Sequence, residues 1–132
     1  MIVIDASVAN KLVLDEEGHK IVREIFKKHV GNIEPITVPD FLFYEIANTL
    51  ATKTYFSTYR VTRSLTKIYS ANLNIYYCGE LEVKAAAKLA KKYKTSVYDM
   101  LYVVVAKALK CSLITADKQF VKQTSFKFVK LL

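Results

Sequence analysis

The stretch Thr95–Asp117 limits the possible folds most, because an apolar helix and an apolar strand follow each other directly in it. Residues 97–109 are apolar on almost every side at helical spacing, which predicts a buried helix. Cys111–Thr115 has the length and composition of a buried strand. Asp99 lies in the first turn of this helix, and Asp117 follows the strand. Buried charge is costly unless it is paired or bound to a metal, so both carboxylates need a physical explanation.

Other short apolar runs alternate with helical patterns along the whole chain. The expected strands are Met1–Ile4, Ile36–Val38, Leu73–Cys78, Cys111–Thr115 and Phe126–Leu132. The run Leu73–Cys78 alternates too little for an edge strand, which predicts a buried one. Helical patterns open at Ala6, Asp15, Asp40, Thr54, Gly79 and Ser96. This alternation predicts an α/β fold with a mainly parallel central sheet of four or five strands.

Several polar residues have structural interpretations. The acids of Asp15–Glu17 are expected at the start of a helix, where the helix dipole favours negative charge. Asp40 is expected to be the N-cap of the helix that runs to about Lys53. His19 and His29 have no metal-ligand partners nearby in the sequence, and both are expected on the surface.

The composition predicts one globular domain over residues 1–132, with 52% hydrophobic and 24% charged residues. No apolar run reaches the roughly 18 residues that a membrane span needs. The N-terminus lacks the pattern of a signal peptide, so we expect it to be retained. Cys78 and Cys111 are expected to be buried free thiols of a cytoplasmic protein.

The net charge of +8 suggests a polyanionic partner. Seventeen lysines against three arginines favour diffuse attraction to phosphates over bidentate reading of bases. A lysine-rich solvated surface without such a partner is the alternative.

The acidic residues are predicted to gather at one edge of the sheet. Asp5, Asp40 and Asp117 each follow a predicted strand, and parallel strands end at the same edge. Glu45 lies about one turn into the helix after the second strand, near that edge. Whether Asp99 reaches the edge depends on the handedness of a connection that the sequence does not show.

Each acid also has a structural interpretation. Asp5 and Asp117 can cap the helices that follow them, Ser96 and Asp99 have the spacing of a capping box, and Glu45 can simply border an apolar face. Several carboxylates at one edge, however, repel and raise each other's pKa.

A bound hard cation would remove this repulsion. Mg²⁺ and Mn²⁺ take oxygen ligands and keep several waters, so three or four carboxylates suffice. Zinc fits poorly, because the histidines and cysteines lack ligand spacing. A serine–histidine triad lacks a suitable histidine, and three glycines form no phosphate loop. A carboxylate-bound metal beside a basic surface indicates phosphodiester hydrolysis through a metal-activated water.

Four segments in register resemble the PIN-domain ribonucleases, and most of all the VapC-type toxins of toxin–antitoxin pairs. They read IDAS at Asp5, VPDFLFYEIANTL around Glu45, TSVYDMLYVVVAKAL around Asp99 and LITADKQF around Asp117. The resemblance spans nearly the whole chain. It implies a three-layer α/β/α fold and a Mg²⁺- or Mn²⁺-dependent endoribonuclease whose catalytic, metal-binding acids are Asp5, Glu45, Asp99 and Asp117.

The same resemblance implies supporting roles and partners. Ser7 would hydrogen-bond Asp5 or a metal-bound water, and Thr115 would do the same for Asp117. Some relatives carry a further acid after the last motif, which this chain lacks. Whether the site holds a second metal ion is therefore undecided, and Asp117 is the only candidate ligand there. Relatives are commonly homodimers inhibited by an antitoxin, here of the VapB type.

Basic residues that flank the acidic motifs are candidates for RNA phosphate contacts, with plain solvated side chains as the alternative. They are Lys53, Arg60, Arg63, Lys118 and Lys122. Tyr55, Phe56 and Tyr59 suit a dimer interface or core packing better than stacking on bases. Two other functions remain open: a PIN nuclease of RNA maturation or decay without an antitoxin, and a catalytically weak RNA-binding scaffold.

Overall fold

The computed structural model describes residues 1–132 and contains one sheet of five parallel strands. The strands are β1 (Ile2–Ile4), β2 (Ile36–Pro39), β3 (Asn74–Tyr76), β4 (Ser112–Thr115) and β5 (Val129–Leu131), in the order β3-β2-β1-β4-β5. The central strand β1 places Val3 opposite Thr37 of β2 and Leu113 of β4. The predicted parallel sheet is confirmed, with all five strands in it.

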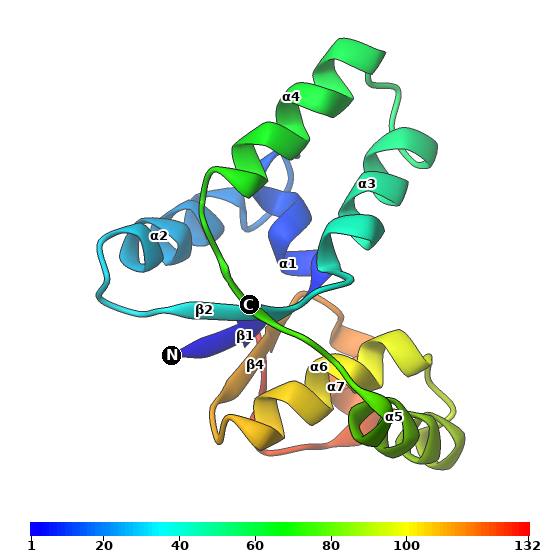
Figure 1. Cartoon of the computed structure of the whole chain (residues 1–132). Helices are drawn as coiled ribbons and strands as arrows, with labels where there is room; N and C mark the ends of the chain where they lie inside the picture. Colours follow the sequence, from blue (N-terminus) through cyan, green and yellow to red (C-terminus); the bar gives the residue numbers. More distant parts are fainter.

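Helices cover both faces of the sheet (Figure 1). The helices are α1 (Ala6–Ala9), continued by the 3₁₀ turn η1 (Asn10–Leu12), α2 (His19–Val30), α3 (Leu42–Thr52), α4 (Thr58–Tyr69), α5 (Glu80–Tyr93), α6 (Val97–Ala108) and α7 (Lys118–Thr124). One layer holds α1 to α4 and the other holds α5 to α7. The three-layer α/β/α architecture is therefore confirmed. None of these helices is long and apolar enough to cross a membrane.

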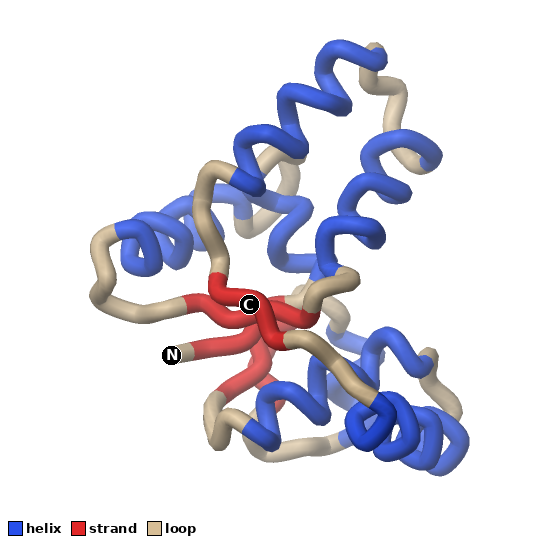
Figure 2. Tube along the Cα trace, viewed as in Figure 1, coloured by secondary structure: helices blue, strands red, loops and turns tan.

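Helix α6 forms the centre of its layer. The Ser96 hydroxyl accepts a hydrogen bond from the Asp99 backbone N–H at 3.0 Å and so fixes where the helix begins. Its buried side chains, which include Met100 and Tyr102, pack in one core with β1, β2 and β4. On the opposite face, α3 and α4 form a hairpin that projects away from the sheet (Figure 2).

The third strand differs from the expectation, because β3 is an edge strand. Asn74 is exposed, while Ile75 and Tyr76 are half-buried. An edge strand has a neighbour on one side only, so an apolar run of this length can remain partly open to solvent. The buried strand predicted over Leu73–Cys78 was wrong in its position in the sheet.

Two helix starts were also wrong. Helix α2 begins at His19, after Gly18 with φ of 87°, and Asp15–Glu17 lie in the preceding turn. Asp40 is not the N-cap of α3, because β2 runs through Pro39 and Phe41 occupies that position.

His29 was expected on the surface but is only 8% exposed. Its Nδ1 accepts a hydrogen bond from the Ile36 backbone N–H at 3.0 Å, and its Nε2 lies 3.2 Å from the Asn72 carbonyl oxygen. Since Nδ1 accepts, the ring proton is on Nε2, which donates to that carbonyl. The imidazole therefore joins the end of α2 to β2 and to the turn before β3.

Candidate active site

Four carboxylates from four separate segments line one pocket of about 120 Å³. Asp5 follows β1, Glu45 lies early in α3, Asp99 is in the first turn of α6, and Asp117 follows β4. The remaining lining residues are Ala6, Ser7, Tyr102 and Phe120. The structure thus brings together all four acids that the sequence singled out, at the carboxyl edge of the sheet.

The direction of α6 explains why Asp99 belongs to this group. The chain passes from the end of α6 directly into β4, which is parallel to β1. A helix that leads into a parallel strand must run back against the strand direction, so its first turn lies at their carboxyl edge. This resolves the one placement that the sequence left open.

Asp5 is held rigidly at the end of β1. Its Oδ1 accepts hydrogen bonds from the Ser7 hydroxyl at 2.6 Å and from the Val8 backbone N–H at 3.0 Å, so Asp5 also caps α1. Burial raises the pKa of Asp5, although the Ser7 and Thr115 hydroxyls oppose this. The charge of Asp99 raises it further.

Glu45 is fixed by a tyrosine that the sequence did not single out. The Tyr102 hydroxyl donates a hydrogen bond to Glu45 Oε2 at 2.5 Å. Burial raises the pKa of Glu45, and the charges of Asp99 and Asp5 add to the rise. Burial and Glu45 hold the pKa of Tyr102 well above its usual range, so it remains a donor. The signal for Tyr102 was its position three residues after Asp99, on the same face of α6.

Ser7 and Thr115 connect the two turns that carry Asp5 and Asp117. The Ser7 hydroxyl accepts from the Ala116 backbone N–H at 2.9 Å and lies 3.5 Å from the Thr115 hydroxyl. Thr115 is fully buried, and its hydroxyl accepts from the Asp117 backbone N–H at 3.1 Å. The side chain of Asp117 caps α7 by accepting from the Phe120 N–H at 2.9 Å. The capping interpretations of Asp5 and Asp117 therefore hold alongside their place in the pocket.

The oxygen-only donor set fits a hard divalent cation in chemistry. Carboxylates are the ligands that Mg²⁺ and Mn²⁺ take, and these ions complete their shells with water. As the side chains lie, however, no group of three or more carboxylate, thiol or imidazole side chains is arranged to hold one ion. An ion would therefore have to be held by fewer direct ligands and by water.

Asp40 and the two cysteines stay outside the pocket. Both cysteines are free and half-buried. Burial, followed by the charges of Asp40 and Glu82, raises the pKa of Cys78 to about 11. Burial also raises the pKa of Cys111, so neither thiol is set up as a thiolate ligand or nucleophile.

The five candidate phosphate contacts come from three parts of the chain. Lys118 and Lys122 lie on α7, next to Asp117, and Lys53 ends α3 at the far end of the hairpin. Arg60 and Arg63 lie on α4. All five side chains are exposed to solvent.

Solved structures with this fold include a toxin and a toxin–antitoxin complex. PAE2754 from Pyrobaculum aerophilum has a TM-score of 0.73 at 19% identity, covering 98% of this chain and 87% of its own. Mycobacterium tuberculosis VapC20, described as a sarcin-ricin loop cleaving toxin, has a TM-score of 0.73 at 10% identity, with 98% and 97% covered. VapBC2 from Rickettsia felis, bound to a DNA fragment from its promoter, has a TM-score of 0.71 at 14% identity, with 100% and 99% covered.

At these identities the likeness establishes the fold alone. No protein of curated function matches the sequence. The PIN domain family model matches residues 2–125, which is nearly the whole chain. This match supports a nuclease. The chain therefore belongs to the PIN domain family.

Proposed function

We propose that residues 1–132 form a single-domain, metal-dependent endoribonuclease that cuts RNA in the cytoplasm. The observation that carries this proposal is the convergence of Asp5, Glu45, Asp99 and Asp117 on one pocket of a protein whose net charge is +8. A cluster of negative charge inside a positive molecule suits a site that must attract a polyanion and hold a cation next to it.

Asp5, Asp99, Asp117 and Glu45 would hold Mg²⁺ or Mn²⁺, some of them directly and the others through bound water. When bound, the ion supplies the chemistry of a Lewis acid: it activates water and stabilises the charge that develops on the phosphate. The raised pKa values of Asp5 and Glu45 support this role, because a cation would stabilise the ionised forms that burial disfavours.

The chain's own residues set the geometry. Ser7 and Val8 fix Asp5, and Tyr102 fixes Glu45, so these two carboxylates do not have to be ordered when the substrate arrives. Ser7 and Thr115 would keep the Asp5 and Asp117 turns in register. Lys118 and Lys122, on the helix that Asp117 caps, would contact phosphates on either side of the scissile bond.

We further propose that the protein is the toxin of a toxin–antitoxin pair and pairs with a second copy of itself. The shared fold with a VapC toxin and with VapBC2 supports the first point, with a VapB-type antitoxin as the partner. Exposed tyrosines on the α3–α4 hairpin, including Tyr44, Tyr55 and Tyr59, support a protein contact there.

The test compares cleavage of total RNA by the wild type, Asp99→Asn and Asp40→Asn. Asp40 follows β2 at the same edge of the sheet but does not line the pocket, so it is a matched control. We expect wild type and Asp40→Asn to cleave only when Mg²⁺ or Mn²⁺ is present, and Asp99→Asn to lose the activity while remaining folded. Equal cleavage by all three proteins, or cleavage in excess chelator, would show that the pocket is not the active site.

A further inference from the structure

Two rows of positive side chains with the same spacing lie on α2 and α4. They meet at one hollow, which Arg23 and Lys27 of α2 line together with Lys67 of α4. Lys20, Arg23 and Lys27 lie on α2, and Arg60, Arg63 and Lys67 repeat the same spacing on α4. Positions i, i+3 and i+7 fall on one face of a helix, and each row extends over about 10 Å. All three arginines of the chain are in these rows.

The rows line three adjoining hollows of about 450, 530 and 330 Å³. The first is lined by Arg60, Arg63 and Lys67, and the second shares Lys67 with it. The second and third share Arg23 and Lys27. We call these three adjoining hollows, with their six basic residues, the α2–α4 trough. It does not include any of the four acids of the candidate active site.

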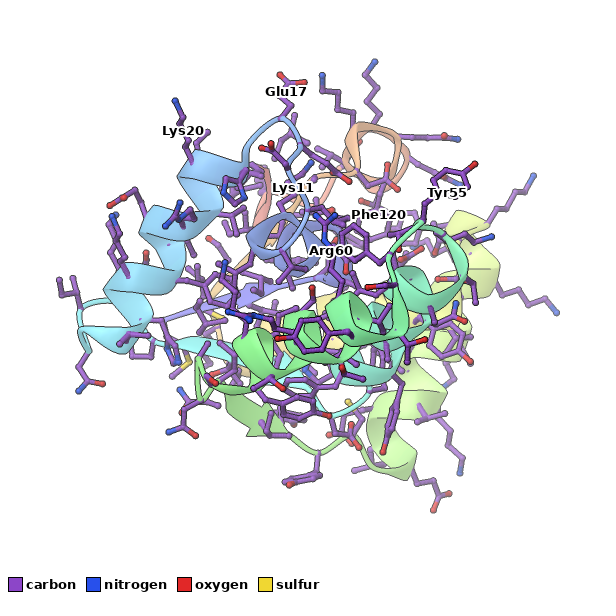
Figure 3. The ribbon with its side chains drawn as sticks, turned by 90° about the horizontal axis from the view of Figure 1, so that it is seen from above. Lys11, Glu17, Lys20, Tyr55, Arg60 and Phe120 are labelled. Atoms are coloured by element: carbon purple, nitrogen blue, oxygen red, sulfur yellow. The ribbon has the colours of Figure 1, made fainter.

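The cations of α4 are held in place without a carboxylate. The Arg60 guanidinium carbon lies 3.6 Å from the centre of the Phe56 ring, and Arg63 donates to the Tyr59 hydroxyl at 2.9 Å. Lys67 donates to the Leu12 carbonyl at 3.1 Å. In the view down onto α4, Arg60 lies over the middle of the molecule, whereas Lys20 projects at its margin (Figure 3).

Only one acid lines the trough. Glu24 pairs with Lys27 at 2.6 Å, and both side chains are largely exposed. The other five cations form no salt bridge, so the six cations of the trough outnumber its single acid by five. Guanidinium groups fixed by an aromatic ring or a hydroxyl lose less conformational freedom when they bind an oxyanion.

We propose that the α2–α4 trough binds the sugar–phosphate backbone of RNA outside the pocket of the four carboxylates. This inference rests on the proposed function in that RNA is the ligand. The observations favour a phosphate backbone over an acidic protein segment where the cations are densest. The first hollow, where Arg60 and Arg63 lie, has one apolar lining residue of six, whereas the second has four of nine. Regular rows of cations match a polymer with one charge per nucleotide.

The experiment measures binding of a fluorescently labelled single-stranded RNA by anisotropy in excess chelator, over a series of salt concentrations. The trough variant is Arg60→Gln/Arg63→Gln/Lys67→Gln. The control, Lys88→Gln/Lys91→Gln/Lys92→Gln on α5, removes the same charge from the opposite layer (Figure 1). A second variant, Arg60→Gln/Arg63→Gln, leaves the Lys67–Leu12 hydrogen bond intact, and thermal melting checks the folding of each protein.

For the trough variant we expect Kd to rise about 10-fold or more at moderate salt and the slope of log K against log salt to fall by about 2, since each lost phosphate contact removes about 0.7. The control is expected to keep the wild-type slope. An equal loss of RNA affinity in both triple variants would show that the effect comes from net charge alone, and would overturn the proposal. If the trough variant bound RNA with the affinity of the wild type, the proposal would also be overturned. An acidic protein segment would then be the better candidate for the trough. Because binding is measured without metal, an absence of cleavage would refute the proposed function and leave this result standing.

Discussion

The hydroxyl of Ser7 offers the sharpest test of how the candidate active site is held together. It donates to the Asp5 carboxylate and accepts from the Ala116 backbone N–H. The hydroxyl therefore joins the start of α1 to the turn after β4. Ser7→Ala removes both bonds while it leaves the α1 cap bond from Val8 to Asp5 intact.

The expected loss of unfolding free energy in Ser7→Ala can be worked out from these two hydrogen bonds. A hydrogen bond to an ionised carboxylate contributes about 1.5–3 kcal/mol, and the Ala116 N–H, half-buried and left without a partner, adds about 1 kcal/mol. The total is about 3 kcal/mol, which corresponds to a fall in Tm of roughly 10 °C for a domain of this size. In an Asp5→Asn background the acceptor is neutral, so the cost of Ser7→Ala should fall to about 2 kcal/mol.

The assay is urea unfolding followed by circular dichroism at pH 8 in chelator, for the four proteins of this double-mutant cycle. Ser70→Ala is the control, because the exposed Ser70 hydroxyl only donates to a carbonyl of its own helix, and its loss should cost less than about 0.5 kcal/mol. Equal costs for Ser7→Ala and Ser70→Ala would refute the reasoning. So would a Ser7→Ala cost that is the same with Asp5 and with Asn at that position.

Two further predictions concern stability in the absence of metal. Because the pKa values of Asp5 and Glu45 are raised by folding, the native state binds more protons than the unfolded state, and stability should increase as the pH falls from 7 to 5. Urea midpoints at both pH values should show this gain in the wild type but not in Asp5→Asn/Glu45→Gln; an equal response in both proteins would exclude these carboxyls as its source. His29→Leu should cost about 2–4 kcal/mol in urea unfolding, since it leaves two backbone groups without partners. The exposed neighbour substitution Lys28→Gln should change little, and equal values for the two variants would contradict the structural role of His29.

The sequence predicted the convergence of the acids better than it predicted some of the elements around them. The placement of Asp5 and Asp117 needed only two strand ends and the fact that parallel strands finish at one edge. To place Asp99 at this edge, the direction of α6 must also be known. That direction follows once β4 is known to be parallel to β1.

Features that depend on neighbours in space were not predictable in this way. A run such as Leu73–Cys78 has the same composition at the edge of a sheet as in its middle, and only the strand order shows that β3 has one open side. Tyr102 looked like one more apolar residue of a buried helix, because tyrosine suits both a core and a hydrogen bond. The burial of His29 depends on two backbone partners that come from β2 and from the turn before β3.

The strand order also has a consequence for protein synthesis. The central strand β1 is made first, but its neighbour β4 comes from the far end of the chain, and Ser7 and Thr115 are 108 residues apart. At about 5–20 residues per second, a ribosome needs roughly 5–20 s to add that length. Throughout this interval the nascent chain has Asp5 and, later, Glu45, but not yet Asp117. The candidate active site therefore cannot be complete on a nascent chain until nearly all of the residues described here have been translated.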